Sequence, residues 1–325
     1  MNEHGSTAGS PSARDAPGAV EISQSRSTAL GAVPIRRALP HRARRTVGAW
    51  CFVDHMGPAE VTEHHGLDVG PHPHIGLQTV TWLTAGEVLH RDSLGTEQLI
   101  RPGQLNLMTA GHGVSHAEEA TGTYRGQLQG VQLWVAQPST TRHGAAAFEH
   151  HAELPTIQLG HGTATVLIGE FSGVASPARR DTDHVGIDLD LRAGRTVLPV
   201  ADDFEYAVVV LDGAISIGAD VLAPGHLGYL GTGRDELALQ TAGPTRALLI
   251  GGIPFPEPVL MWWNYVARDR AEIIAAHREW TQGDERFGRV ASRLARVDVA
   301  PPPWPATIVN PDDATAHDCG QNRLL

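Results

Sequence analysis

Two short segments of the sequence carry side chains that could bind a transition metal. One contains His72 and His74, separated by a proline, and the other contains His116 and Glu118, separated by an alanine. Residues two apart in a β-strand point to the same face of the sheet. Two such pairs on neighbouring strands therefore predict three imidazoles and one carboxylate around a single point. Imidazole suits Fe, Ni, Cu or Zn, and a histidine and carboxylate set with open positions is typical of Fe(II) oxygenases.

A single pair of histidines is weak evidence for a metal, because the chain contains 18 histidines and chance pairs are expected. The second pair strengthens the metal interpretation, since strand-like sequence separates the two segments. Histidines without such spacing are expected on the surface or in supporting roles; they are His64, His65, His112, His150 and His151. The segment 89–92 resembles a kinase catalytic tripeptide at His90, but no glycine-rich loop accompanies it. We therefore assign His90 no role from the sequence.

The prolines that flank the first histidine indicate what kind of strand carries it. Pro71 and Pro73 have no backbone N–H to donate to a sheet. Such residues are confined to edge strands or bulges. We expect this strand to lie at an edge, where the imidazoles can face a cavity.

Short strands separated by tight turns fill most of the chain. Between residues 49 and 136, apolar segments such as 77–83 end at Gly, Pro or Asp, and residues 165–251 repeat this style. Regular spacing of short strands favours a sandwich or small barrel over alternating strands and helices. Two related β-barrels in one chain would explain the pattern.

One helix is predicted near the C-terminal end of the sequence. Asp269 can cap its first turn, Glu272 follows three residues later, and Gly283 ends the run. Four residues have the spacing of one helical face; they are Ile273, Ile274, His277 and Trp280. The proline-rich remainder is expected to be an extended tail that packs on a domain surface.

Composition restricts the classes of partner. The formal net charge of −11 argues against a general nucleic-acid binder, which would need a basic patch. Two distant cysteines, Cys51 and Cys319, fit a reducing compartment. Neither a secretory signal nor an apolar run of membrane-spanning length is recognisable, so we expect a cytoplasmic protein without a membrane partner.

Beyond these local patterns, the sequence resembles the pirin family, a branch of the cupin superfamily. The matching stretches are residues 47–58, 71–80 with the HPH motif, 86–95, 101–111, 116–119 with the HAE motif, and 128–135. Residues 254–258 and 263–266 resemble the C-terminal end of the family, so the resemblance extends over roughly residues 35–274. It implies an all-β chain of two tandem cupin barrels, resembling jelly rolls, with a C-terminal helix.

The resemblance and the strand pattern divide the chain into four parts. We expect a disordered N-terminal segment over 1–30, a metal-binding barrel over 31–145, a metal-free barrel over 146–265, and a helix with an extended tail over 266–325. Ordered structure should begin near Val33. The second barrel is expected to be metal-free because its corresponding stretch, residues 194–199, contains no ligand.

In pirins the metal, usually taken as iron, is bound by the residues that match His72, His74, His116 and Glu118. The general cupin pattern places a glutamate where this sequence has Gln78, so the carboxylate is expected from Glu118. The resemblance thus implies one mononuclear metal, with Fe(II) favoured and Ni, Mn, Cu or Zn as alternatives.

Two functions follow from the resemblance. Several pirins resemble quercetin 2,3-dioxygenases, in which a deprotonated flavonol reacts with dioxygen, its ring opens and carbon monoxide leaves. Here Glu118 would be a ligand and also the catalytic base. Other pirins resemble iron-dependent cofactors without turnover, which bind a transcription factor or a metabolic enzyme. The partner is therefore expected to be a small aromatic substrate with dioxygen, or a protein.

Overall fold

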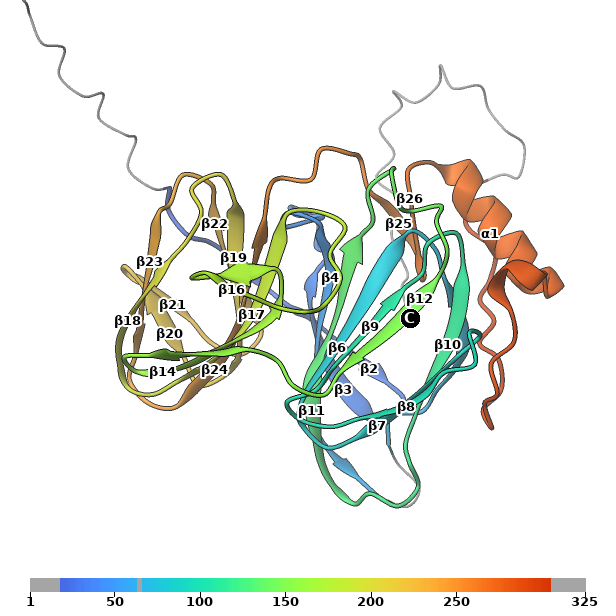
Figure 1. Cartoon of the computed structure of the whole chain (residues 1–325), viewed down its shortest axis with the longest axis horizontal. Helices are drawn as coiled ribbons and strands as arrows, with labels where there is room; N and C mark the ends of the chain where they lie inside the picture. The colour runs from blue at the N-terminus through green and yellow to red at the C-terminus, as the bar shows by residue number, and fades with distance from the viewer. Residues whose placement is uncertain (1–17, 63–65, 305–325) are drawn as a thin grey trace, which may run out of the picture.

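The protein consists of two antiparallel β-barrels that lie side by side, as Figure 1 shows for the computed structural model. The structure describes residues 18–62 and 66–304. The prediction of an all-β chain with tandem barrels and one C-terminal helix is confirmed.

The N-terminal barrel is built from a seven-stranded and a four-stranded sheet. In spatial order, the larger sheet contains β12 (Ala147–His151), β9 (Leu105–Thr109), β6 (Leu77–Ala85), β11 (Gly126–Ala136), β4 (Trp50–Val61), β3 (Val33–Leu39) and β2 (Arg26–Leu30). The smaller sheet contains β5 (Val69–His74), β10 (Val114–Glu119), β7 (Val88–Asp92) and β8 (Glu97–Ile100).

The C-terminal barrel repeats this plan. Its larger sheet contains β1 (Glu21–Gln24), β22 (His226–Gly231), β19 (Glu205–Asp212), β24 (Thr245–Gly252), β17 (His184–Leu191), β14 (Gly162–Ile168) and β13 (Thr156–Leu159). Its smaller sheet contains β18 (Gly194–Pro199), β23 (Glu236–Thr241), β20 (Ile215–Ile217) and β21 (Asp220–Leu222). Two separate hairpins pair β15 (Glu170–Phe171) with β16 (Val174–Ala175), and β25 (Leu260–Trp262) with β26 (Tyr265–Ala267).

Glycine permits the tight turns that the sequence indicates. Gly86 connects β6 to β7 with a φ of 91°, and Gly213 follows β19 with a φ of 74°. Both values lie in the left-handed region that most other residues avoid. A Cβ on Gly213 would also lie 2.5 Å from the Pro244 carbonyl oxygen, so glycine is required there for space as well.

Two boundaries differ from the sequence-based expectation. Residues 21–30 are not disordered but form β1 and β2, because β1 pairs with β22 and β2 pairs with β3. Residues 1–17 lie outside the described residues. Strand β12 falls within the range expected for the second barrel, yet it pairs with β9 of the first. Strands from beyond the assigned ranges thus complete both larger sheets: β2 and β12 in the first barrel and β1 in the second.

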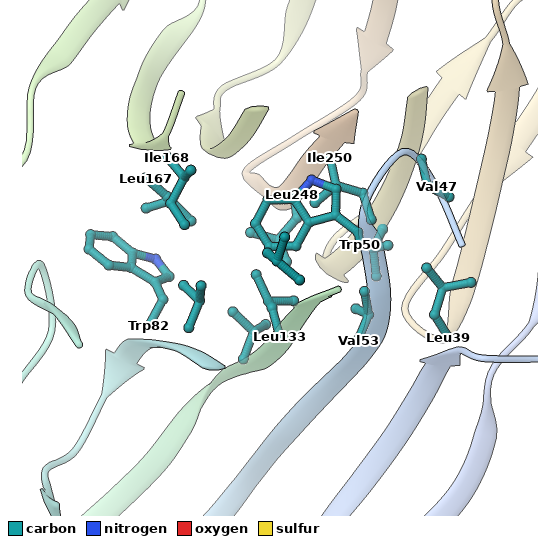
Figure 2. Packing of buried hydrophobic residues seen from close by; sticks show 14 of the residues in the cluster. Leu39, Val47, Trp50, Val53, Trp82, Leu133, Leu167, Ile168, Leu248 and Ile250 are labelled. Carbon is teal, nitrogen blue, oxygen red and sulfur yellow. The ribbon is translucent and has the colours of Figure 1, made fainter. Parts of the chain in front are cut away.

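The barrels are joined by a shared apolar core between their larger sheets. Figure 2 shows Trp50, Trp82 and Leu133 from the N-terminal barrel facing Leu248 and other residues of the C-terminal barrel. The Trp50 indole also donates to the carbonyls of Val185 and Gly251, at 3.1 and 3.2 Å. Residues 50–57 of β4 are all buried, because one face of this strand contributes to its own barrel and the other packs on the second.

The C-terminal helix α1 (Arg270–Gln282) lies on the side of the N-terminal barrel away from the second barrel (Figure 1). Its predicted ends are confirmed, because Asp269 accepts from the Glu272 backbone N–H at 2.9 Å and Gly283 has a φ of 74°. Ile274 is half-buried, and the fully buried residues are Ile273, Ala276, His277 and Trp280. The Glu272 carboxylate pairs with Arg142, which fixes the helix to the barrel. No helix in the described part of the chain is long and apolar enough to cross a membrane.

The segment after α1 runs back over the N-terminal barrel. It begins with the short helix η1 (Glu285–Phe287), whose Phe287 carbonyl accepts from the Ser115 hydroxyl at 2.7 Å. Farther on, the Val297 N–H donates to the Pro71 carbonyl of β5 at 2.8 Å. The tail therefore covers the outer edge of the strand that carries the HPH motif.

Candidate metal centre

Three buried imidazoles meet inside the N-terminal barrel. Strands β5 and β10 pair so that His72 lies opposite His116 and His74 lies opposite Val114. One nitrogen from each of the three histidines lies within 4.8 Å of the others. The Nε2 atoms of His74 and His116 are 3.0 Å apart. The alternation argument thus correctly predicts that three imidazoles gather around one point.

The local sequence explains why β5 presents its histidines in this way. It is an edge strand of the smaller sheet, and its register with β10 shifts between His116 and Glu118. Pro71 lies in the shifted stretch and cannot donate to β10. The prediction of an edge or bulged strand at Pro71 and Pro73 is therefore confirmed.

Hydrogen bonds fix the orientation of two of the rings. His72 Nδ1 donates to the Gly70 carbonyl at 2.9 Å, and His74 Nδ1 donates to the Asn264 carbonyl at 3.0 Å. With Nδ1 protonated, a neutral imidazole keeps its lone pair on Nε2. Asn264 lies in the turn between β25 and β26, so a segment distant in sequence completes the site.

Burial keeps these imidazoles neutral. Desolvation lowers the pKa of His72 to about 4, and it lowers the pKa values of His74 and His116 well below the usual range. A metal ligand must be in the neutral form. Three neutral nitrogen donors that converge in a buried site fit a divalent first-row transition metal. The three-histidine cluster therefore has the chemistry of a cupin metal site.

Glu118 lines the same cavity as the three histidines but is not part of their close group. Burial raises the pKa of its carboxyl group. The Thr81 hydroxyl lies 3.4 Å from Glu118 Oε1 and 2.8 Å from Gln132 Oε1, so its proton is directed mainly toward Gln132. The carboxylate of Glu118 is thus placed to accept a proton or to join a cation.

Gln78, at the position of the general cupin glutamate, points elsewhere. Residues two apart on β6 share a face, and Val80 and Trp82 both belong to the core between the barrels. The Gln78 amide accordingly donates to Thr109 at 3.0 Å and does not line the cavity. A carboxylate at this position would lie on the opposite face of β6 from Thr81.

His90 is a site residue that the sequence reasoning missed. Its Nδ1 lies 3.4 Å from His116 Nδ1, and its Nε2 lies 3.0 Å from Asp92 Oδ2. Its ring stacks on Phe148 with centroids 4.5 Å apart. The signal was the alternation of His90 and Asp92 on a strand that pairs with β10, where His90 lies opposite Glu118.

The remaining histidines lie apart from the three-histidine group. His150 contacts Asn106 at 2.7 Å, and His151 contacts Glu149 at 3.0 Å, both half-buried on β12. His112 is more exposed, with its ring centroid 6.4 Å from that of His143. His64 and His65 lie outside the described residues.

The histidines open onto a cavity of about 600 Å³. Its larger apolar lining residues are Phe52, Met56, Trp134, Met261 and Trp263. Phe52 and Trp134 stack with centroids 4.0 Å apart, and the Arg37 guanidinium lies 4.4 Å above the Phe52 ring. Arg37 is itself held by the Asp54 carboxylate at 2.7 and 2.8 Å. An apolar cavity with a few fixed polar groups is typical of a small-molecule site.

Comparison with known proteins shows what this chain is similar to. The family profile described as Pirin matches residues 32–135, and the profile described as the Pirin C-terminal cupin domain matches residues 186–288. A Pseudomonas aeruginosa protein provisionally named a quercetin 2,3-dioxygenase is 46% identical over 90% of this chain and 95% of its own length. A pirin-like protein of Caulobacter vibrioides is 33% identical over 78% of this chain and 90% of its own.

A solved structure agrees with these relationships. The crystal structure of quercetin 2,3-dioxygenase from Acinetobacter baumannii aligns with a TM-score of 0.84 and 42% identity. The alignment covers 89% of this chain and 97% of the other. The arrangement of two barrels is thus shared with that protein over nearly its whole length.

Proposed function

This chain belongs to the pirin family, and from that premise we propose that it is a mononuclear metal-dependent dioxygenase acting on a flavonol such as quercetin. The observation that carries the proposal is the group of three buried imidazoles at the wall of an aromatic-lined cavity. The provisional dioxygenase name of the 46% identical relative supports the reaction class.

The metal would be held by His72, His74 and His116, with Glu118 as the fourth protein ligand. Fe(II) is the metal we propose, since a histidine and carboxylate set with open positions is typical of Fe(II) oxygenases. Once bound, the metal would supply a Lewis acid and a template for dioxygen and a substrate oxygen.

The cavity would bind and orient a planar substrate. Its volume of about 600 Å³ suits a drug-sized molecule, and Trp134, Met261 and Trp263 contribute apolar surface to its lining. The same lining would exclude water from the reacting atoms. Arg37, held by Asp54, would keep the Phe52 ring in place against Trp134, and both charged residues also line the cavity.

Glu118 would act as the base for the flavonol hydroxyl. Burial raises the pKa of its carboxyl group in the site without a metal. Its carboxylate lines the cavity together with the three histidines, where it would meet the hydroxyl of a bound flavonol. Because the Thr81 proton is directed to Gln132, Oε1 of Glu118 keeps the capacity to take the hydroxyl proton.

Flavonol turnover tests the proposal. The protein is loaded anaerobically with Fe(II), freed of excess metal and analysed for bound iron, and quercetin absorbance is then followed in air and without oxygen. We expect oxygen-dependent loss of absorbance, and Glu118→Gln should lower kcat by about 100-fold or more. His151→Ala is the matched control and should retain wild-type turnover.

Bound iron without any flavonol turnover would contradict the dioxygenase function but would still support the metal site. That result would favour the alternative of an iron-dependent binding protein. Lack of bound metal after anaerobic loading would contradict both.

A further inference from the structure

A row of three side chains runs from the last residue of β7 to the three-histidine cluster. Asp92 Oδ2 lies 3.0 Å from His90 Nε2, and His90 Nδ1 lies 3.4 Å from His116 Nδ1. All three residues are at most 4% exposed. Of the three clustered imidazoles, only that of His116 has a side chain as its Nδ1 neighbour, since His72 and His74 use backbone carbonyls.

The hydrogen bonds of Asp92 set the position of each proton in this row. Asp92 Oδ1 accepts from the backbone N–H groups of Leu94 and Thr96, both at 2.9 Å, so the carboxylate is fixed as an acceptor. Its Oδ2 then accepts from His90 Nε2–H. A neutral His90 keeps its lone pair on Nδ1, where it can accept from His116 Nδ1–H. The lone pair of His116 is left on Nε2, the atom that lies 3.0 Å from His74 Nε2.

We propose that His90 is a positioning residue that, through Asp92, holds His116 in the tautomer and ring orientation needed to bind a metal through Nε2. This inference rests on the metal site of the proposed function. A carboxylate or carbonyl partner on the second ring nitrogen commonly raises ligand basicity and fixes the ring. Here an imidazole connects the ligand to the carboxylate.

A purely structural role for His90 makes a different prediction. Its ring stacks on Phe148 with an interplanar angle of 22°, so removal of the ring would also change packing. Two amide variants separate the roles. Asn carries its oxygen on Cγ, at the level of Nδ1, and can still accept from His116. Gln carries its oxygen one atom farther out, at the level of Nε2, and cannot replace the Nδ1 acceptor.

The test measures Co(II) affinity by chelator competition and records the visible spectrum of the Co(II) protein. We expect His90→Gln to weaken Co(II) binding by about 10–100-fold and to alter the spectrum. His90→Asn should remain close to wild type in both respects. Phe148→Leu changes the stacking without touching the hydrogen bonds, and it should also remain close to wild type.

A second measurement needs no variant that could fail to fold. In metal-free wild-type protein labelled with ¹⁵N-histidine, the ring nitrogen shifts should show His116 protonated on Nδ1 and His90 protonated on Nε2. The opposite tautomer of either ring would overturn the proposal.

Other outcomes would overturn it as well. One is wild-type Co(II) affinity in His90→Gln. Another is a loss of Co(II) affinity that is equal in His90→Asn and His90→Gln. The third is a loss of Co(II) affinity in Phe148→Leu as large as that in His90→Gln. If the wild-type protein itself binds no Co(II), the metal site is wrong and His90 has no ligand to position. That result is distinguishable, because the other outcomes require a wild-type protein that binds.

Discussion

The two barrels share one strand plan but differ in what fills them. The four-stranded sheet of the N-terminal barrel has the order β5-β10-β7-β8, and that of the C-terminal barrel has the corresponding order β18-β23-β20-β21. In the first, His72 pairs with His116 across the sheet, whereas in the second Leu198 pairs with Leu237. The corresponding strand pair of the second barrel thus buries an apolar pair where the first barrel buries two imidazoles.

The contents of the two barrels indicate different roles: one interior contributes mainly to stability, and the other buries polar groups that could act on a ligand. Apolar burial is the main favourable contribution to folding, and a large cluster of apolar side chains fills the C-terminal barrel. The N-terminal barrel instead buries several imidazoles and the Glu118 carboxyl, whose desolvation is unfavourable. Such groups are retained where they act on a ligand.

The largest effect is expected from removal of a histidine of the cluster. His72→Ala removes one of three nitrogen donors, and it should abolish transition-metal binding as measured by elemental analysis after anaerobic Fe(II) loading. His151→Ala, on β12 of the same barrel, should keep the wild-type metal content. Equal retention in both variants would count against the three-histidine site.

The C-terminal barrel should respond in the opposite way to the equivalent change. Leu198→Ala creates a cavity among fully buried side chains and should lower the free energy of unfolding by about 2–5 kcal/mol. Metal content should remain that of the wild type. Val197→Ala is the control, since Val197 is 40% exposed and should change stability by only about 0.5 kcal/mol. Denaturant titration measures the free energies of unfolding of the two variants. Loss of bound metal from a folded Leu198→Ala protein would contradict the assignment of metal binding to the N-terminal barrel alone.

The comparison also extends to a buried histidine that is not part of the three-histidine group. His184, at the start of β17, contacts Trp50 edge-on, and its Nε2 has no hydrogen-bond partner among the described residues. Burial lowers its pKa to about 4. The unfolded chain takes up this proton below about pH 6.5 but the folded chain only below about pH 4. Stability should therefore fall as the pH is lowered through this window.

His184→Asn tests this contribution, because Asn can still donate to the Thr182 carbonyl, as His184 Nδ1 does at 3.0 Å. As the pH is lowered from 6.5 to 4, the free energy of unfolding should fall less in the variant than in the wild type. The difference between the two decreases should reach up to about 3 kcal/mol. Unfolding midpoints across the pH range measure it. Identical pH profiles of wild type and variant would show that His184 titrates normally.

The features that local sequence could predict are those set by neighbouring residues. The alternation of His72 with His74, the strand edge at Pro71, and the cap at Asp269 all follow from spacing and residue type. The missed features depend on distant segments. His90 gains its role only because β7 pairs with β10, and β1 is ordered only because β22 offers it a partner. Pairing between distant strands is not encoded in the local pattern of either strand.

The smallest effect is expected at Gln78, where local sequence and fold give different answers. The general cupin pattern would place a metal-binding carboxylate here, but the side chain faces the core between the barrels and contacts Thr109. Gln78→Glu should therefore leave the affinity for Fe(II) or Co(II) unchanged. It should lower the free energy of unfolding by about 1–3 kcal/mol, because a carboxyl replaces a hydrogen-bonded amide in a fully buried place. Metal titration of the two proteins in parallel decides the matter: tighter binding by the variant would mean that this position reaches the metal after all, and that the carboxylate role does not belong to Glu118 alone.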